Sequence, residues 1–300
     1  MLLKTWGRIP VLIRAAIGGY LLVQFGSLVT ILPVLGNLKF QPEIPWALPG
    51  VILICWAYWK YFSGYGWPVG TQGARRRVSR TDARTDYSIA RLSMMLFFGL
   101  VFILSYRLIM PSLFAMPPQN LSIDLADFPM LTAIGFIVSV AMGAALVEET
   151  ALRGYAQRLM EDRYGLIPAI ALVSLLFWYV HLNHEFMTFK HIPFYVIAST
   201  IACFAAYVSR SLIPVMIMHF VADMILLPLY GFRPAITEEL LSAQPVWDVG
   251  ATPSFYVAAV TCVIAGVLTG CFMWLLAQDH WGKNARKSRV DVHKSWSAHD

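Results

Sequence analysis

The chain has 300 residues, of which 58% are hydrophobic and only 13% are charged, and its mean hydropathy is +0.62. This composition excludes an ordinary soluble globular protein and indicates a membrane protein with several spans. The net charge of +6 suits a nucleic-acid-binding protein only if the basic residues form a surface patch, so their placement decides its meaning.

Eight apolar segments follow one another along the chain, and their lengths suit helices in a membrane. They run over Ile13–Leu35, Trp46–Tyr65, Ile89–Met110, Met130–Val147, Leu166–Leu182, Ile192–Val208, Leu212–Tyr230 and Pro253–Gln278. The sequence therefore predicts an all-α fold, a polytopic membrane helix bundle of about eight transmembrane helices. Residues 1–279 are expected to form a single transmembrane domain, and residues 280–300 a polar cytoplasmic tail.

The basic residues are distributed unequally between the two sides of such a bundle. Most belong to the N-terminal residues, the run from Arg75 to Arg84 and the C-terminal tail, whereas the opposite loops hold only Lys39, Lys190 and Arg233. The positive-inside rule therefore predicts that both termini are cytoplasmic. Arg107, near the end of its apolar segment, is expected to reach the lipid headgroups. The positive charge thus indicates that the partner is a lipid bilayer and not a nucleic acid. The inner (plasma) membrane of a bacterium is the expected location.

Three of the segments carry polar residues at a spacing of four. Glu148-Glu149-x-x-x-Arg153 extends the fourth segment, Phe177-x-x-x-His181 lies in the fifth, and His219-x-x-x-Asp223 lies in the seventh. This spacing places the paired residues on one face of a helix. Ionisable side chains inside a membrane cost several kcal/mol unless they have partners, so these residues form the candidate functional site.

The lengths of the helices place the acids and the first histidine at the same depth. If the fourth helix continues to about Glu161 and the fifth begins near Ile167, Glu148 and His181 both lie roughly 20 Å from the turn between them. The polar pair of the seventh segment reaches a compatible depth. The three motifs are therefore expected to converge in one layer of the bundle.

This set of side chains is suited to peptide hydrolysis. A carboxylate such as Glu148 and an imidazole such as His181 can together hold and deprotonate a water. A second imidazole, His219, with Asp223 beside it, can stabilise the oxyanion of an attacked carbonyl. We predict that Glu148 is the general base and that Glu149 is its structural neighbour, ion-paired within the same motif.

Together the motifs resemble those of the CPBP family of intramembrane proteases, which includes the eukaryotic CAAX prenyl endopeptidase and bacterial bacteriocin self-immunity proteins. The family motifs EExxxR, FxxxH and HxxxN or HxxxD are matched in order by EETALR, FWYVH and HFVAD, within a motif core of residues 130–230. The resemblance implies an intramembrane endopeptidase, CAAX-protease-like, that hydrolyses a peptide bond of a membrane-associated protein or peptide.

By this resemblance, Glu148 and His181 would activate the water, while His219 and Asp223 would complete the site. Prenylated CAAX substrates also follow only from the resemblance. An asparagine in the last motif position is a ready donor to an oxyanion, whereas Asp223 donates only when it is protonated, so its role stays open.

A metal at this site is an alternative that the sequence leaves open. Glu148, His181 and His219 form a possible set of three zinc ligands with a fourth position for water. No spacing in the chain matches a known zinc signature, so a glutamate-type enzyme without a cofactor is favoured over a zinc metalloprotease. The other histidines nearby, His184 and His191, are expected to be loop residues.

Two other classes of protein fit parts of the same pattern. Intramembrane Glu, His and Asp residues also form proton relays in proton-coupled transporters and channels, although the chain shows no repeated half and no helix pair interrupted by Gly or Pro. A non-catalytic immunity or partner-binding membrane protein would keep the motifs and sequester a toxin. The protease is favoured because the three motifs occur in order.

Overall fold

The computed structural model describes residues 6–80, 87–114, 116, 123–182, 184, 187–232 and 245–296, and for residues 280–296 it describes the backbone alone. Within these ranges all regular secondary structure is helical. Arg233, one of the basic residues used to predict the topology, lies outside the described residues, as do the last four residues of the predicted tail.

In the part of the chain that the structure describes, eight long helices form the bundle. They are α2 (Val11–Phe40), α3 (Ala47–Phe62), α5 (Ile89–Leu113), α6 (Met130–Glu148), α8 (Leu166–Tyr179), α9 (Ile192–Ser209), α10 (Ile213–Gly231) and α13 (Pro253–Trp296). Short elements connect them, namely η1 (Val69–Thr71), α4 (Gln72–Ser79), η2 (Leu125–Asp127), η3 (Glu149–Ala156), α7 (Gln157–Tyr164), η4 (Phe189–His191) and α12 (Val246–Val249). Each long helix coincides with one of the eight predicted apolar segments, which confirms the all-α prediction.

Among the described residues, six helical stretches are long and apolar enough to cross a membrane. They are Val11–Phe40, Ile89–Leu113, Met130–Tyr164, Phe189–Ser209, Ile213–Gly231 and Pro253–Asp279. The other two apolar helices, α3 and α8, have 16 and 14 residues. They measure about 24 and 21 Å, which is less than the roughly 30 Å of a bilayer core. A polytopic membrane bundle is therefore confirmed, with six full-length spans and two shorter apolar helices.

The fourth predicted helix continues without a break to Tyr164, but its middle is not α-helical. Between α6 and α7, η3 is a π-helix that begins at Glu149, immediately after Glu148. A π-helix has i→i+5 hydrogen bonds and occurs frequently at functional sites. The change from α-helix to π-helix therefore falls between the two acids.

The short helix α4 is docked against this π-helix. Beyond its end, Arg80 donates a hydrogen bond from Nε to the carbonyl oxygen of Arg153 at 3.1 Å and pairs with Glu161 at 3.1 Å. Gly154 allows the close approach, because a Cβ at this position would overlap the carbonyl oxygen of Val78. Contacts from a distant part of the chain thus support the π-helical segment.

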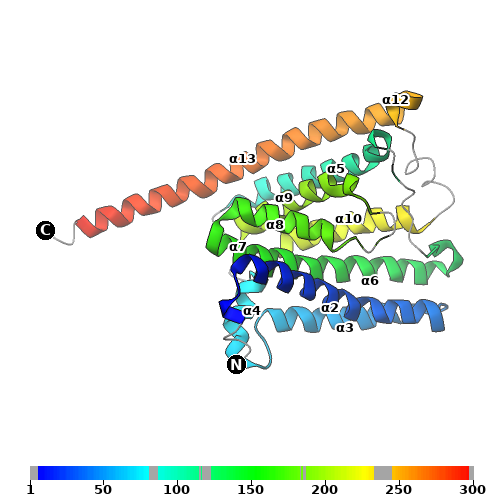
Figure 1. Cartoon of the computed structure of the whole chain (residues 1–300), viewed down its shortest axis with the longest axis horizontal. Coiled ribbons are helices and arrows are strands. Elements are labelled where there is room, and N and C mark those ends of the chain that lie inside the picture. The colour runs from blue at the N-terminus through cyan, green and yellow to red at the C-terminus, as the bar shows by residue number, and fades with distance from the viewer. Residues whose placement is uncertain are drawn as a thin grey trace.

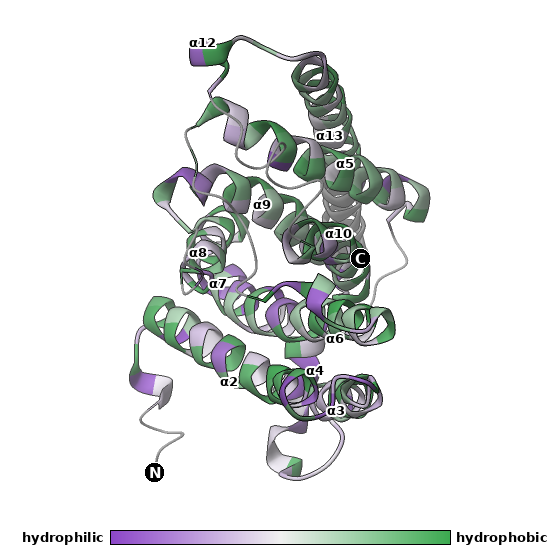
Figure 2. Cartoon of the chain, turned by 90° about the vertical axis from the view of Figure 1, so that its right-hand side faces the viewer, coloured by the Kyte–Doolittle hydropathy of each residue, from purple (hydrophilic) through white to green (hydrophobic). Residues whose placement is uncertain are grey.

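The helices pack in layers, as Figures 1 and 2 show. At one edge α2 and α3 pack against each other and against α6, and at the opposite edge α13 packs along α5. Helices α8, α9 and α10 lie between them, with α8 against α9 and α10 against α6. The part of the chain from α6 to α10 therefore occupies the middle of the bundle.

Helix α2 begins and helix α13 ends on the same side of the bundle, at the left of Figure 1, as an even number of crossings requires. The last helix, α13, continues to Trp296 and includes most of the predicted tail. Which side of the membrane this end of the bundle faces stays a prediction from the basic residues.

Candidate active site

The two adjacent acids lie where α6 meets η3, and their side chains have different partners. Glu148 is 8% exposed and Glu149 is 1% exposed. Glu149 Oε1 accepts a hydrogen bond from Arg153 Nη1 at 3.0 Å. Arg153 also donates to Ser199 Oγ on α9 at 3.2 Å, and its guanidinium lies 4.6 Å from the centre of the Phe177 ring. Glu148 Oε2, by contrast, has no hydrogen-bond partner among the described residues.

His181 lies just beyond the last residue of α8. Its Nδ1 is 2.7 Å from the carbonyl oxygen of Phe177. Because a carbonyl oxygen can only accept, Nδ1 carries the proton, and in the neutral ring the lone pair is on Nε2. Nε2 lies 3.9 Å from Glu148 Oε2. The two side chains thus lie at the same level, as the helix lengths predict.

His219 and Asp223 lie one turn apart on α10 and complete the cluster. His219 Nδ1 is hydrogen-bonded to Glu149 Oε1 at 2.8 Å. Its Nε2 is 4.0 Å from Glu148 Oε2 and 3.5 Å from Asp223 Oδ2. Since Nδ1 is engaged by a carboxylate, Nε2 is the nitrogen that is available to a ligand.

The separations around Glu148 Oε2 suit a single bridging oxygen. Distances of 3.9 and 4.0 Å to the two imidazole nitrogens are too long for direct hydrogen bonds. A water that makes two hydrogen bonds of about 2.8 Å spans such a gap. The arrangement can therefore hold one water between a carboxylate and an imidazole, with a second imidazole beside it.

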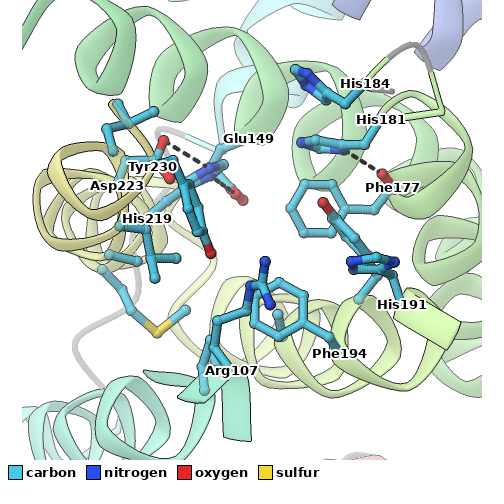
Figure 3. A pocket seen from close by; sticks show the side chains of 18 of the residues that line it. Arg107, Glu149, Phe177, His181, His184, His191, Phe194, His219, Asp223 and Tyr230 are labelled. Atoms are coloured by element: carbon cyan, nitrogen blue, oxygen red, sulfur yellow. Dashed lines mark hydrogen bonds and ion pairs between the residues drawn. The ribbon is translucent and has the colours of Figure 1, made fainter. Parts of the chain in front are cut away.

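A cavity of about 180 Å³ adjoins these groups. In Figure 3, His219 and Asp223 lie across this cavity from His181 and Phe177, while Arg107 enters it from α5. The remaining polar and aromatic wall comprises Glu149, Arg153, His184, His191, Phe194, Tyr195 and Tyr230. Glu148 is not part of this wall, although its Oε2 lies within 4.0 Å of both imidazole rings.

The aromatic residues hold the first histidine in place. The Phe177 ring lies edge-on to the rings of His181 and Tyr195, with centres 5.1 Å away in both cases. The Tyr195 ring lies 4.9 Å from His181. Edge-to-face packing of this kind stabilises a defined ring orientation. The FxxxH spacing therefore gives the histidine both a backbone acceptor and a packing partner.

The structure brings all of the predicted site residues into one cluster, but sequence analysis missed part of the wall. Arg107 is 4% exposed and lines the cavity, so the expectation that it reaches the lipid headgroups is wrong. His191 is 1% exposed and lies in η4, whereas it was expected in a loop; His184 does lie in the connection between α8 and η4. For Arg107, the sequence did offer a signal, because a cation within an apolar segment is a candidate functional residue. Tyr195 and Tyr230 gave no comparable signal.

The side chains do not form a metal site as they are arranged. Within the described ranges, no group of three or more His, Cys, Asp or Glu side chains has the geometry to hold a metal ion. The candidate ligands Glu148, His181 and His219 keep separations of 3.9 and 4.0 Å from carboxylate oxygen to nitrogen. Ligands at 2.0–2.1 Å from one tetrahedral zinc would lie about 3.3 Å apart, so this set would have to contract around the ion.

The comparisons with known proteins agree with the motifs. Residues 130–225 match the sequence model of a family described as Rce1-like, type II CAAX prenyl endopeptidase Rce1-like. All three motifs and the helices from α6 to most of α10 lie inside this range. Searches of curated proteins and of solved structures found no match. Residues 130–225, which contain every predicted site residue, are therefore similar to the CAAX-type protease family that the three motifs resemble.

Proposed function

We propose that the protein is a glutamate-type intramembrane endopeptidase, in which Glu148 and His181 activate the attacking water. The observation that carries this proposal is the position of Glu148 Oε2, 3.9 Å from His181 Nε2 and 4.0 Å from His219 Nε2. These side chains come from three separate segments of the chain. Because buried ionisable groups in a membrane are costly, their convergence on one point supports a shared function.

The reaction begins with a water held between Glu148 Oε2 and His181 Nε2. Glu148 removes one proton, and the hydroxide oxygen forms a bond to the carbonyl carbon of the substrate peptide. The electron pair of the carbonyl moves onto its oxygen and gives a tetrahedral oxyanion. Glu148 then returns the proton to the leaving nitrogen as the C–N bond breaks, which releases an amine and a carboxylic acid.

His219 is suited to stabilise the oxyanion. Its Nδ1 is engaged by Glu149, and its Nε2 can donate to a substrate oxygen when the ring carries both protons. A preorganised donor of this kind contributes about 10²- to 10³-fold to a rate. We assign Asp223, 3.5 Å from Nε2, as a positioning residue that orients this ring. Glu149 has the same task on the other side of the ring.

The substrate that we propose first is a prenylated peptide of the CAAX type. This follows from the description of the matched family. The cavity supports a peptide end with an apolar side chain, since Ile103, Met218, Leu226 and Leu227 give the wall apolar surface next to the polar groups. Apolar walls with a few convergent polar groups are typical of sites that bind small ligands.

A cleavage assay against a peptide library tests the proposal. Purified protein in lipid nanodiscs would be compared with Glu148→Ala and with Asp162→Asn, a carboxylate that is 41% exposed and pairs with Arg77 at the surface. We expect cleavage by the wild type and by Asp162→Asn, and loss of about 10²- to 10⁴-fold in Glu148→Ala, as for removal of a general base. Equal cleavage by all three proteins would refute the proposal.

A further inference from the structure

Arg107 lies in the wall of the catalytic cavity but outside the part of the chain that matches the protease family. It belongs to α5, whereas the match covers residues 130–225. Its side chain is 4% exposed and points into the cavity in Figure 3. The three motifs do not account for a cation at this place.

Among the described residues, the contacts of Arg107 include no acidic side chain. Its guanidinium lies 5.8 Å from the centre of the Phe194 ring and 5.2 Å from that of Tyr230, with which it also forms a side-chain hydrogen bond. In the part of the chain that the structure describes, its Nη1 has no hydrogen-bond partner. None of the ion pairs between described residues includes Arg107. Because a buried cation costs free energy unless it meets an anion, Arg107 is poised to bind one.

The cavity indicates which kind of anion fits. A guanidinium presents paired N–H donors that match the two oxygens of a carboxylate. Ile103 and Leu226 contribute apolar surface to the same wall. The volume of about 180 Å³ is close to that of an engineered cavity of about 150 Å³ that binds benzene, so it holds a group of about one side chain. The C-terminal residue of a peptide combines a carboxylate with such a side chain.

We propose that Arg107 binds the α-carboxylate at the C-terminus of the substrate and so restricts cleavage to peptide bonds near a free chain end. This proposal rests on the proposed protease function and adds a specificity-determining residue to it. The apolar wall around the cavity receives the last side chain of the substrate. A peptide with a C-terminal amide lacks the charge and is a poor substrate.

The first test compares two forms of one peptide, a fluorescent farnesylated CAAX-type peptide with a free C-terminal acid and the same peptide with a C-terminal amide. For the wild type we expect kcat/KM to be about 10- to 100-fold higher for the acid, in line with a charge-assisted hydrogen bond. In Arg107→Gln, kcat/KM for the acid peptide should fall to the value for the amide peptide, and kcat/KM for the amide peptide should change little. Arg107→Lys keeps the charge and should retain part of the preference. Arg91→Gln serves as a control, because Arg91 on the same helix is 41% exposed and pairs with Asp279.

A binding measurement separates this proposal from the protease function. The Glu148→Gln variant in nanodiscs would be titrated with the acid and amide peptides, and a second variant would add Arg107→Gln. Tighter binding of the acid, lost in the double variant, supports the proposal even if no protein cleaves the peptide. The proposal is wrong if Glu148→Gln, in which Arg107 is intact, binds the acid and amide peptides equally and the wild type cleaves them equally. An equal loss for both peptides in Arg107→Gln would also overturn it, because it indicates a structural role.

Discussion

Glu149 and His219 are 70 residues apart in the chain, yet Oε1 of the first and Nδ1 of the second are joined by a hydrogen bond of 2.8 Å. The same oxygen accepts from Arg153 at 3.0 Å. Glu149 therefore links the π-helix to α10, and this leaves Glu148 as the acid next to the Nε2 atoms of the two imidazoles. The geometry therefore supports different tasks for the adjacent residues Glu148 and Glu149.

Substitution of Glu148 should remove activity without loss of stability, whereas substitution of Glu149 should lower the stability of the protein. Glu148→Gln keeps the shape of a side chain whose Oε2 has no partner among the described residues, so it should abolish cleavage and change the melting temperature little. Glu149→Gln leaves Arg153, 1% exposed, without its counter-ion. Breaking a buried ion pair in this way costs about 3–5 kcal/mol. Reaction of buried thiols with a fluorogenic dye during heating measures both melting temperatures, because Cys55, Cys203 and Cys262 are free and buried. A stable Glu149→Gln protein beside an active Glu148→Gln protein would contradict the assignment.

The role of Asp223 can be tested with a pair of substitutions. Asp223→Asn keeps a polar group beside His219 Nε2 and supplies N–H donors, so it should retain at least about a tenth of kcat/KM. Asp223→Leu removes every polar atom at this point and should lower kcat/KM by about 10²- to 10³-fold. Steady-state kinetics with one peptide substrate measure both. Similar losses in the two variants would indicate that the carboxylate itself is needed.

Gly154 should be essential for the packing of the π-helix. A methyl group at this position would overlap the backbone oxygen of Val78, which cannot rotate away as a side chain would. We expect Gly154→Ala to lower the free energy of unfolding by about 1–3 kcal/mol, as overpacking does. The matched control is Gly73→Ala in α4, where a Cβ meets nothing within 4 Å. If the two variants melt at the same temperature, the close approach of α4 to η3 is not a constraint.

Chelation distinguishes the glutamate-type mechanism from a zinc-dependent one. Treatment with a strong chelator followed by its removal should leave the cleavage rate unchanged, because no step that we propose uses a metal. Metal analysis of the purified protein would accompany the assay. Loss of cleavage that is restored by added zinc would show that Glu148, His181 and His219 contract around an ion, and the proposed mechanism would then be wrong.

Much of the fold could be predicted from hydrophobic periodicity and length alone. The boundaries of α5, α9 and α10 lie within three residues of the apolar segments, because a helix that crosses a bilayer must be predominantly apolar along its length. The depth of Glu148 relative to His181 also followed, since the rise per residue of a helix is fixed. The end of α8 was harder to predict, because the apolar segment continues to Leu182 while the helix ends at Tyr179.

The features that sequence analysis missed depend on contacts between distant segments. The π-helix from Glu149 to Ala156 has no pattern of its own, and it is packed against α4 through Arg80 and Gly154. Arg107 resembled a headgroup anchor because it lies near the end of its apolar segment, as such anchors do. In the bundle α5 packs against α13, α9 and α10, and the Arg107 side chain lines the cavity.

The most direct measurement is peptide cleavage by the purified protein in sealed liposomes, with ion flux across the same membranes recorded in parallel. We predict cleavage by the wild type, a decrease of at least about 10²-fold in Glu148→Gln, and no flux in either sample. Ion flux without cleavage, or cleavage that survives Glu148→Gln, would contradict the central claim that this acid activates a water for peptide hydrolysis.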